Sequence, residues 1–144
     1  MHMMDHDERR AFLLHGTRTA HLATIRENGE PHVAPVWFTL DGDDVVFMTG
    51  ADTVKGRNLR RTHRAAISVD DPAPPYSFVH ISGTAQMFDC GDDMDAAFPH
   101  AWTISARYMG EELAEQYARR NAVAGEMLVR LTPDRIFAQA ELAD

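Results

Sequence analysis

Hydrophobic and polar residues alternate along the first half of the chain, a pattern typical of half-buried strands. A first strand is expected over 20–26, and Asn28-Gly29 then provides a residue pair that tolerates the positive φ of a tight hairpin turn. The partner strand is expected over 32–40. Asp41-Gly42 is a second turn signal and leads to a strand over 44–49. These three strands are predicted to form a meander.

Further strands are expected later in the chain, at 65–69 and 78–88, on either side of a proline-rich segment. A closing strand is predicted in two parts, 127–131 and 136–140, with Thr132-Pro133-Asp134 as an interruption. Gly83 indicates a bulge within the strand expected over 78–88. Pro35 cannot donate a hydrogen bond to a neighbouring strand. The sheet is therefore expected to be open or bulged beside Pro35.

Helices are predicted where the apolar residues recur at helical spacing. The expected helices cover 7–15, 53–62, 94–109 and 111–120, with Gly110 separating the last two. About six strands with meander connections and few helices predict a mostly β fold with α elements. The specific expectation is a small, roughly six-stranded antiparallel barrel with flanking helices.

The length of 144 residues fits one domain over 1–144, with residues 1–6 expected to be frayed. Hydrophobic residues make up 44% and charged residues 25% of the chain, so disordered and fibrous classes are excluded. No apolar run approaches the roughly 20 residues that cross a bilayer. The polar N-terminus does not resemble a signal sequence, and we expect a cytoplasmic protein without a membrane span.

Few residues in the sequence suggest a metal site. The single cysteine, Cys90, excludes an intramolecular disulfide and a cysteine-ligated zinc site. The eight histidines show neither HxxxH nor HExxH spacing. We therefore expect no metal.

Charge is distributed unevenly along the chain. The net charge is −8, which disfavours nucleic acid as a partner. The segment 53–64 is the exception, because it contains five basic residues and no acidic one. Such a segment is either an anion site or a solvated basic surface, and the pattern alone leaves both interpretations open.

The predicted helix that begins at Thr53 has the features of an anion site. Its first turn lacks acidic residues, so its free N–H groups are available to an anion. Lys55 and Asn58 share one face of this helix, and Arg57 and Arg61 share another. Gly56 is expected to let a ligand approach the backbone closely. The GxxxxGK[ST] and GxGxxG spacings are absent, which argues against nucleoside triphosphate and Rossmann dinucleotide sites.

Five segments together resemble a known family. They are, in chain order, LATIRENGEPHVAPVWF, DDVVFMTG, TVKGRNLRR, AAISVDD and SGTAQ. They are similar to the flavin/deazaflavin oxidoreductase superfamily, founded on the pyridoxamine 5′-phosphate oxidases, and most similar to its actinobacterial branch, which uses the deazaflavin coenzyme F420. The resemblance implies a split β-barrel homodimer with the cofactor in a groove at the subunit interface.

The resemblance also implies roles for particular residues. A C-terminal arginine pattern that holds pyridoxal in the true oxidases is not recognisable here, which argues against vitamin B6 oxidation. The residues implied in cofactor binding are Lys55, Arg57 and Asn58 at the phosphate, Arg61 as an accessory, Thr49 near the phosphate or ribityl chain, and Pro35, Val36, Trp37 and Phe38 along the ring system.

The implied activity is hydride transfer from the reduced deazaflavin to an activated double bond of a small organic acceptor, such as an enone, a quinone or a tetrapyrrole. No catalytic side chain is assigned, since the cofactor carries the hydride chemistry. Residues of the acceptor pocket are expected from 74–78 and from the helices after Met94. Two alternatives remain: an FMN-binding oxidase or reductase of the same fold, and a non-catalytic protein that holds a deazaflavin, haem or RNA phosphate.

Overall fold

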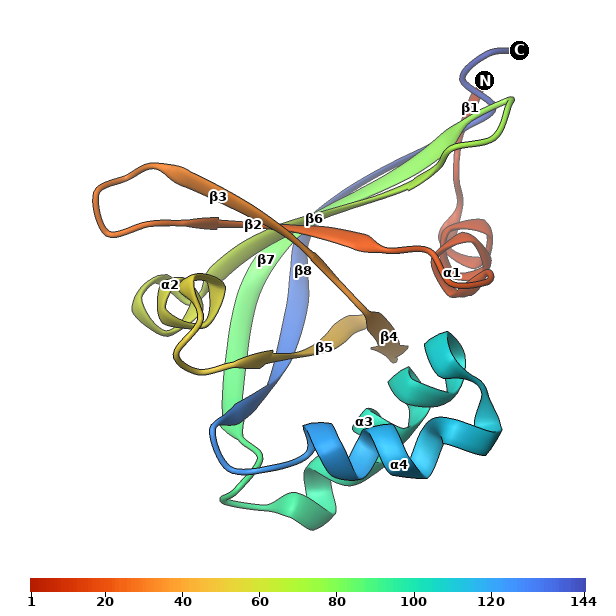
Figure 1. The fold of residues 1–144 in the computed structure, drawn as a ribbon. Coiled ribbons are helices and arrows are strands. Elements are labelled where there is room, and N and C mark those ends of the chain that lie inside the picture. Colours follow the sequence, from red (N-terminus) through yellow and green to blue (C-terminus); the bar gives the residue numbers. More distant parts are fainter.

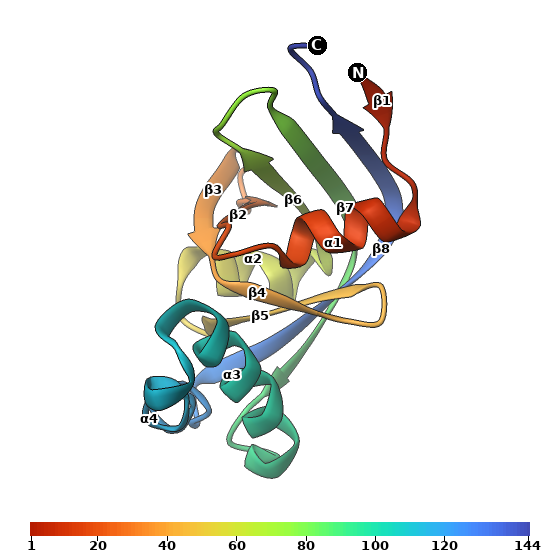
Figure 2. The ribbon, with the colours of Figure 1, turned by 90° about the vertical axis from the view of Figure 1, so that its right-hand side faces the viewer.

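The computed structural model describes residues 1–144 as one antiparallel sheet with four helices around it (Figures 1 and 2). The strands follow the order β3-β2-β6-β7-β8-β5-β4, and β1 pairs with β8 beside this path. The strands are β1 His2–Met3, β2 Ala20–Ile25, β3 Pro31–Val36, β4 Phe38–Asp41, β5 Asp44–Gly50, β6 Arg64–Asp71, β7 Ser77–Asp89 and β8 Glu126–Ala140. The helices are α1 His6–Leu14, α2 Val54–Thr62, α3 Met94–Met109 and α4 Glu111–Asn121.

The predicted strand over 32–40 is wrong as a single element, because the chain breaks at Trp37 into β3 and β4. These two strands are consecutive in sequence but lie at opposite ends of the sheet order. The predicted meander is therefore two separate hairpins, β2–β3 and β4–β5. The sheet curls without closing, which confirms the split barrel. The expectation of an open edge beside Pro35 is also confirmed, since β3 pairs with β2 alone.

The closing strand β8 is continuous, so the predicted interruption at Thr132-Pro133-Asp134 is wrong. The ladder between β7 and β8 instead shifts register there, with Ser82 opposite Arg135 and Gly83 opposite Pro133. One extra residue on β8 is accommodated as a β-bulge. A Cβ atom on Gly83 would lie 2.0 Å from the carbonyl oxygen of Thr132, which confirms that this bulge needs glycine.

The core fills the space that the curled sheet encloses. Its largest buried side chains include Phe38, Phe47, Leu22 and Leu131, and α2 contributes Leu59. A second, smaller apolar cluster lies under α3 and α4, where alanines such as Ala97 and Ala118 allow the two helices to pack closely. Figure 2 shows α3 and α4 together at one end of the sheet. The longest helix has 16 residues, and none is long and apolar enough to span a bilayer.

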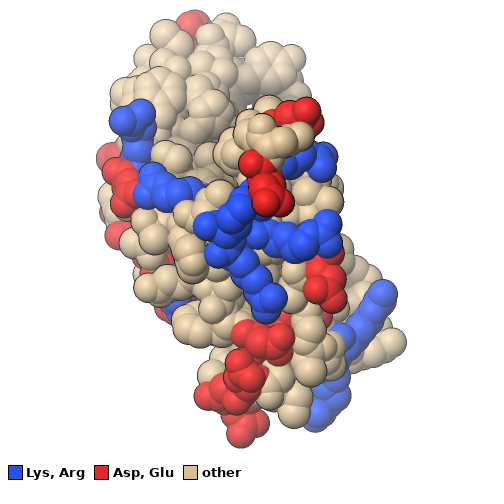
Figure 3. Space-filling model, turned by 90° about the vertical axis from the view of Figure 1, so that its left-hand side faces the viewer, with Lys and Arg blue, Asp and Glu red and all other residues tan.

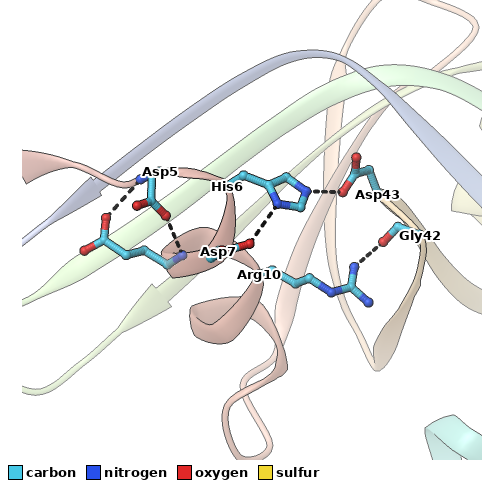
Figure 4. A network of polar contacts seen from close by, with 7 residues as sticks. Asp5, His6, Asp7, Arg10, Gly42 and Asp43 are labelled. Atoms are coloured by element: carbon cyan, nitrogen blue, oxygen red, sulfur yellow. Dashed lines mark hydrogen bonds and ion pairs between the residues drawn. The ribbon is translucent and has the colours of Figure 1, made fainter.

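The N-terminal residues, for which fraying is expected from the sequence, contact the rest of the fold in the structure. His2 and Met3 pair with the end of β8, and Asp5 and Glu8 form a capping box at the start of α1. The His6 ring bonds to the Asp43 carboxylate at 2.7 Å, and Arg10 donates to the Gly42 carbonyl (Figure 4). The Asp43 and Asp7 carboxylates raise the pKa of His6 above its usual value. These polar contacts tie α1 to the β4–β5 turn.

Candidate functional site

A groove of about 340 Å³ lies beside the break between β3 and β4. This volume is within the range of small-molecule sites. We call it the Lys55 groove. It is lined by Thr19, Pro35, Val36, Trp37, Met48, Lys55, Ala101, Ile104, Asn121 and Glu126.

The first turn of α2 gives the Lys55 groove its basic side chain. Thr53 caps the helix by accepting a hydrogen bond from the Gly56 N–H at 3.1 Å, and its own hydroxyl donates to the Gly50 carbonyl at 2.7 Å. The first turn contains Lys55 and no acidic residue. The first N–H groups of a helix have no intrahelical acceptor, so they and Lys55 together favour an anion.

Gly56 has a different role from the expected one. A Cβ atom at this position would lie 2.2 Å from the carbonyl oxygen of Gly50. The absence of a side chain therefore lets α2 pack directly against the end of β5. The close approach is between two backbone segments of the chain and not between backbone and ligand.

Two other predicted residues, Asn58 and Thr49, are buried beneath α2. Asn58 is 3% exposed, and its Nδ2 donates to the Thr24 hydroxyl at 3.0 Å. The Thr49 hydroxyl is 3.2 Å from that of Thr53. Neither side chain lines the Lys55 groove, and their hydrogen bonds connect α2 and its cap to the sheet.

Arg57 and Arg61 face away from Lys55, into a depression of about 390 Å³ beside the β2–β3 hairpin. Arg57 donates to the Asp52 carbonyl at 2.6 Å, while Arg61 donates to the carbonyl of Ile25. Figure 3 shows basic side chains gathered on this face, with acidic side chains around them. We call it the arginine depression; its lining is Arg26, Glu27, Asn28, Val54, Arg57, Asn58 and Arg61. The structure thus divides the predicted phosphate residues between two surfaces.

Trp37 forms part of one wall of the Lys55 groove, and Tyr108 packs against it. The Trp37 ring is stacked on Tyr108, with centroids 4.9 Å apart and planes 2° from parallel. The Tyr108 hydroxyl donates to the Arg18 carbonyl at 2.6 Å and accepts from the Phe38 N–H at 3.3 Å. Burial raises the pKa of Tyr108, so its hydroxyl stays protonated and keeps donating. Tyr108 therefore holds Trp37 in place from outside the groove.

Arg107 holds the backbone in place at the break between β3 and β4. Its guanidinium donates to the carbonyls of Phe38 at 2.8 Å, Leu13 at 2.7 Å and Gly16 at 2.9 Å. It also lies 4.6 Å from the centroid of the Phe38 ring. Phe38 is completely buried in the core and does not line the groove, in contrast to Pro35, Val36 and Trp37.

Glu126, the first residue of β8, adds an acidic group to the Lys55 groove. It pairs with Gly50 in the β5–β8 ladder, so its carboxyl lies beside the loop that leads into α2. Burial raises the pKa of Glu126, and the positive charge of Lys55 opposes that rise. The first turn of α2 lacks acidic residues in the sequence, but the fold brings one to it from a distant strand.

Sequence reasoning missed Arg107, Tyr108 and Glu126. No local motif marks them, because each reaches the site through contacts with residues far away in the chain. Of the helices after Met94, α3 contributes Ala101 and Ile104 to the lining of the groove and α4 contributes Asn121. The segment 74–78 lines no part of the groove. No three His, Cys, Asp or Glu side chains lie close enough together to hold a metal ion.

Comparison with known protein families agrees with this architecture. A family model described as pyridoxamine 5'-phosphate oxidase matches residues 6–140. The chain belongs to the pyridoxamine 5'-phosphate oxidase family. A comparison with curated protein sequences finds no match.

Several solved structures are similar to this chain, and three of them have different descriptions. A conserved hypothetical protein from Mycobacterium tuberculosis is 24% identical, with a TM-score of 0.79 over 94% of this chain and 84% of that one. An F420 reductase is 25% identical, with a TM-score of 0.66 over 88% of this chain and 94% of that one. A heme storage protein from Vibrio cholerae is 18% identical, with a TM-score of 0.74 over 96% of this chain and 98% of that one. The first and third likenesses concern the fold alone.

Proposed function

We propose that this protein is an oxidoreductase that binds coenzyme F420 in the Lys55 groove and passes a hydride to an activated double bond of a small organic acceptor. The observation that carries the proposal is the meeting of Lys55, from the first turn of α2, with Trp37 and Pro35 in one groove. Membership of the pyridoxamine 5'-phosphate oxidase family supports a flavin-type cofactor. The likeness to an F420 reductase favours the deazaflavin.

The residues of the groove fit a flat, polycyclic ligand with a phosphate at one end. Lys55 suits the phosphate because it is positive, and the first turn of α2, which has no acidic residue, adds a favourable potential. Pro35, Val36 and Trp37 offer an apolar surface of the kind that an aromatic ring system contacts. The polarity of the groove therefore matches the polarity of such a cofactor.

Each part of the chain has a definite task under this proposal. A reduced deazaflavin supplies the hydride from C5 when it is bound. Lys55 holds the phosphate. Asn58 and Thr49 hold α2 against the sheet through their hydrogen bonds, and so fix the position of Lys55. Arg57 and Arg61 contribute positive potential from the arginine depression. Met48, Ala101 and Ile104 exclude water from the ring end of the groove.

We further propose a homodimer. An open apolar hollow of about 530 Å³ lies on the outer face of β2, β3, β6, β7 and β8, where Val33 is 64% and Phe137 is 45% exposed. Val33 in this hollow and Pro35 in the Lys55 groove are two residues apart on the same face of β3. A second copy seated on the hollow would therefore border the groove.

Equilibrium binding of coenzyme F420 and of FMN, measured side by side, tests the proposal. We expect F420 to bind at micromolar or lower concentration and Lys55→Ala to weaken it at least tenfold, a loss of about 1.4 kcal/mol. Arg60→Ala is the matched control, since Arg60 is exposed on the same helix and lines neither surface. It should change the affinity by less than twofold.

The outcomes of this measurement are distinct. Tighter binding of FMN would assign the protein to the FMN-dependent oxidases or reductases. Binding of neither cofactor would refute the proposed function. Equal losses in Lys55→Ala and Arg60→Ala would mean that the ligand responds to the overall basic charge of α2 and not to the groove.

A further inference from the structure

Glu126 is the one acidic side chain in a groove that otherwise suits an anion. Its position follows from the ladder between β5 and β8, which places it opposite Gly50. A Cβ atom on Gly50 would lie 3.4 Å from Glu126 Oε1 and 3.2 Å from the Thr53 side chain. The carboxyl group thus lies next to the residue that caps α2.

The carboxyl group has no competing partner. It makes no hydrogen bond within the chain, and it lies beyond the ion-pair distance of 4.0 Å from Lys55. Burial raises its pKa, and only Lys55 acts in the opposite direction. A carboxyl in this condition takes up a proton readily when a second negative charge approaches.

The other titratable groups around Glu126 do not replace this role. Asp89 and Cys90 lie at the end of β7, where the Cys90 N–H donates to the Glu126 carbonyl at 2.8 Å. Asp89 accepts hydrogen bonds from the backbone of Gly91 and Gly125, and Cys90 is buried with a raised pKa. Asn121 from α4 is uncharged. Neither Asp89 nor Cys90 lines the groove.

We propose that Glu126 determines the charge preference of the Lys55 groove, by taking up one proton from solvent when a phosphate-bearing ligand binds. The ionised carboxylate repels a phosphate at Lys55, whereas the protonated carboxyl removes the repulsion and can donate a hydrogen bond to a phosphate oxygen. This inference rests on the proposed function, because it requires the phosphate to enter this groove. Its consequence is that phosphate-bearing ligands bind more weakly as pH rises, by up to tenfold per unit, while neutral ligands do not.

FMN and riboflavin form a matched pair for the test, since they differ only by the phosphate. Calorimetric titration in two buffers of different ionisation enthalpy measures proton uptake, with wild type and Glu126→Gln compared at pH 8. The protonation of the free phosphate is the same in both titrations, so a difference in proton uptake arises in the complex, from Glu126 and the phosphate that it faces. Asp52→Asn is the control, because it removes one negative charge beside α2 from an exposed position outside the groove.

We expect wild type to take up more protons per FMN than Glu126→Gln does, and Glu126→Gln to bind FMN at least tenfold more tightly. Riboflavin affinity should change less than twofold in either variant, as should FMN affinity in Asp52→Asn. The same titration with coenzyme F420 applies if FMN is rejected.

Two results would overturn the inference alone. One is equal FMN affinity and equal proton uptake in wild type and Glu126→Gln. The other is weaker binding of both FMN and riboflavin to the variant, which would make Glu126 an acceptor for an uncharged part of the ligand. Binding of neither FMN nor F420 at any pH would refute the proposed function and this inference together.

Discussion

Replacement of Arg107 by alanine should destabilise the whole fold, although Arg107 lines no part of the groove. Its guanidinium donates to three backbone carbonyls, those of Phe38, Leu13 and Gly16. The bonds to Phe38 and Leu13 are part-buried, while the bond to Gly16 is exposed. A hydrogen bond that involves a charged group contributes about 1.5 kcal/mol or more when it is shielded from water. Two such bonds give an expected loss of about 3 kcal/mol.

Urea unfolding followed by tryptophan fluorescence measures this loss, because Trp37 lies beside the break that Arg107 secures. Arg119→Ala is the matched control, since Arg119 forms an exposed ion pair with Glu115 on α4. Such pairs contribute at most about 0.5 kcal/mol. A loss below about 1 kcal/mol in Arg107→Ala, or equal losses in both variants, would refute the argument that the arginine fixes the break between β3 and β4.

Three further outcomes follow from the structure. Gly83→Ala should lower the free energy of unfolding by about 2 kcal/mol or more, because its methyl group meets a β8 carbonyl at 2.0 Å, and wild-type stability in urea would contradict this. His6 should titrate above its usual pKa in NMR spectra, and Asp43→Asn should lower that value; an unchanged titration would exclude the contact in Figure 4. Since the folded pKa is the raised one, this contact stabilises the fold fully below the unfolded pKa and is lost as pH rises through the folded value. Val33→Asp with Phe137→Asp should convert the proposed dimer to a monomer in light scattering, and a monomeric wild type would disprove the dimer.

The sequence predicts those parts of the fold that depend on neighbouring residues. Asn28-Gly29 and Asp41-Gly42 mark two hairpins because their φ requirements are local. The break at Trp37 could not be predicted in this way, since Val36, Trp37 and Phe38 form a continuous apolar run. Only the distant partners of β3 and β4, which lie at opposite ends of the sheet, show that the strand divides.

The same distinction applies to the candidate site. Lys55 could be recognised from the charge of its own segment, and Pro35 and Trp37 from the resemblance to a family. The burial of Asn58 depends on Thr24, which is 34 residues away. The carboxyl of Glu126 reaches α2 only because β8 pairs with β5. The local spacing of residues does not contain that information.

The position of β8 has a consequence for folding. This strand is the last in the chain, yet it pairs with β1, β5 and β7 and so joins the two hairpin-bearing halves of the sheet. During synthesis β5 and β7 emerge before β8, their common partner. Until β8 is made, the edges that it will cover are unpaired. Such non-local pairing is slow, typically milliseconds to seconds, and it leaves strand edges open to aggregation. Between their end residues, β5 and β7 contain no Asp, Glu, Lys or Arg, so charge does little to protect these edges before β8 pairs with them.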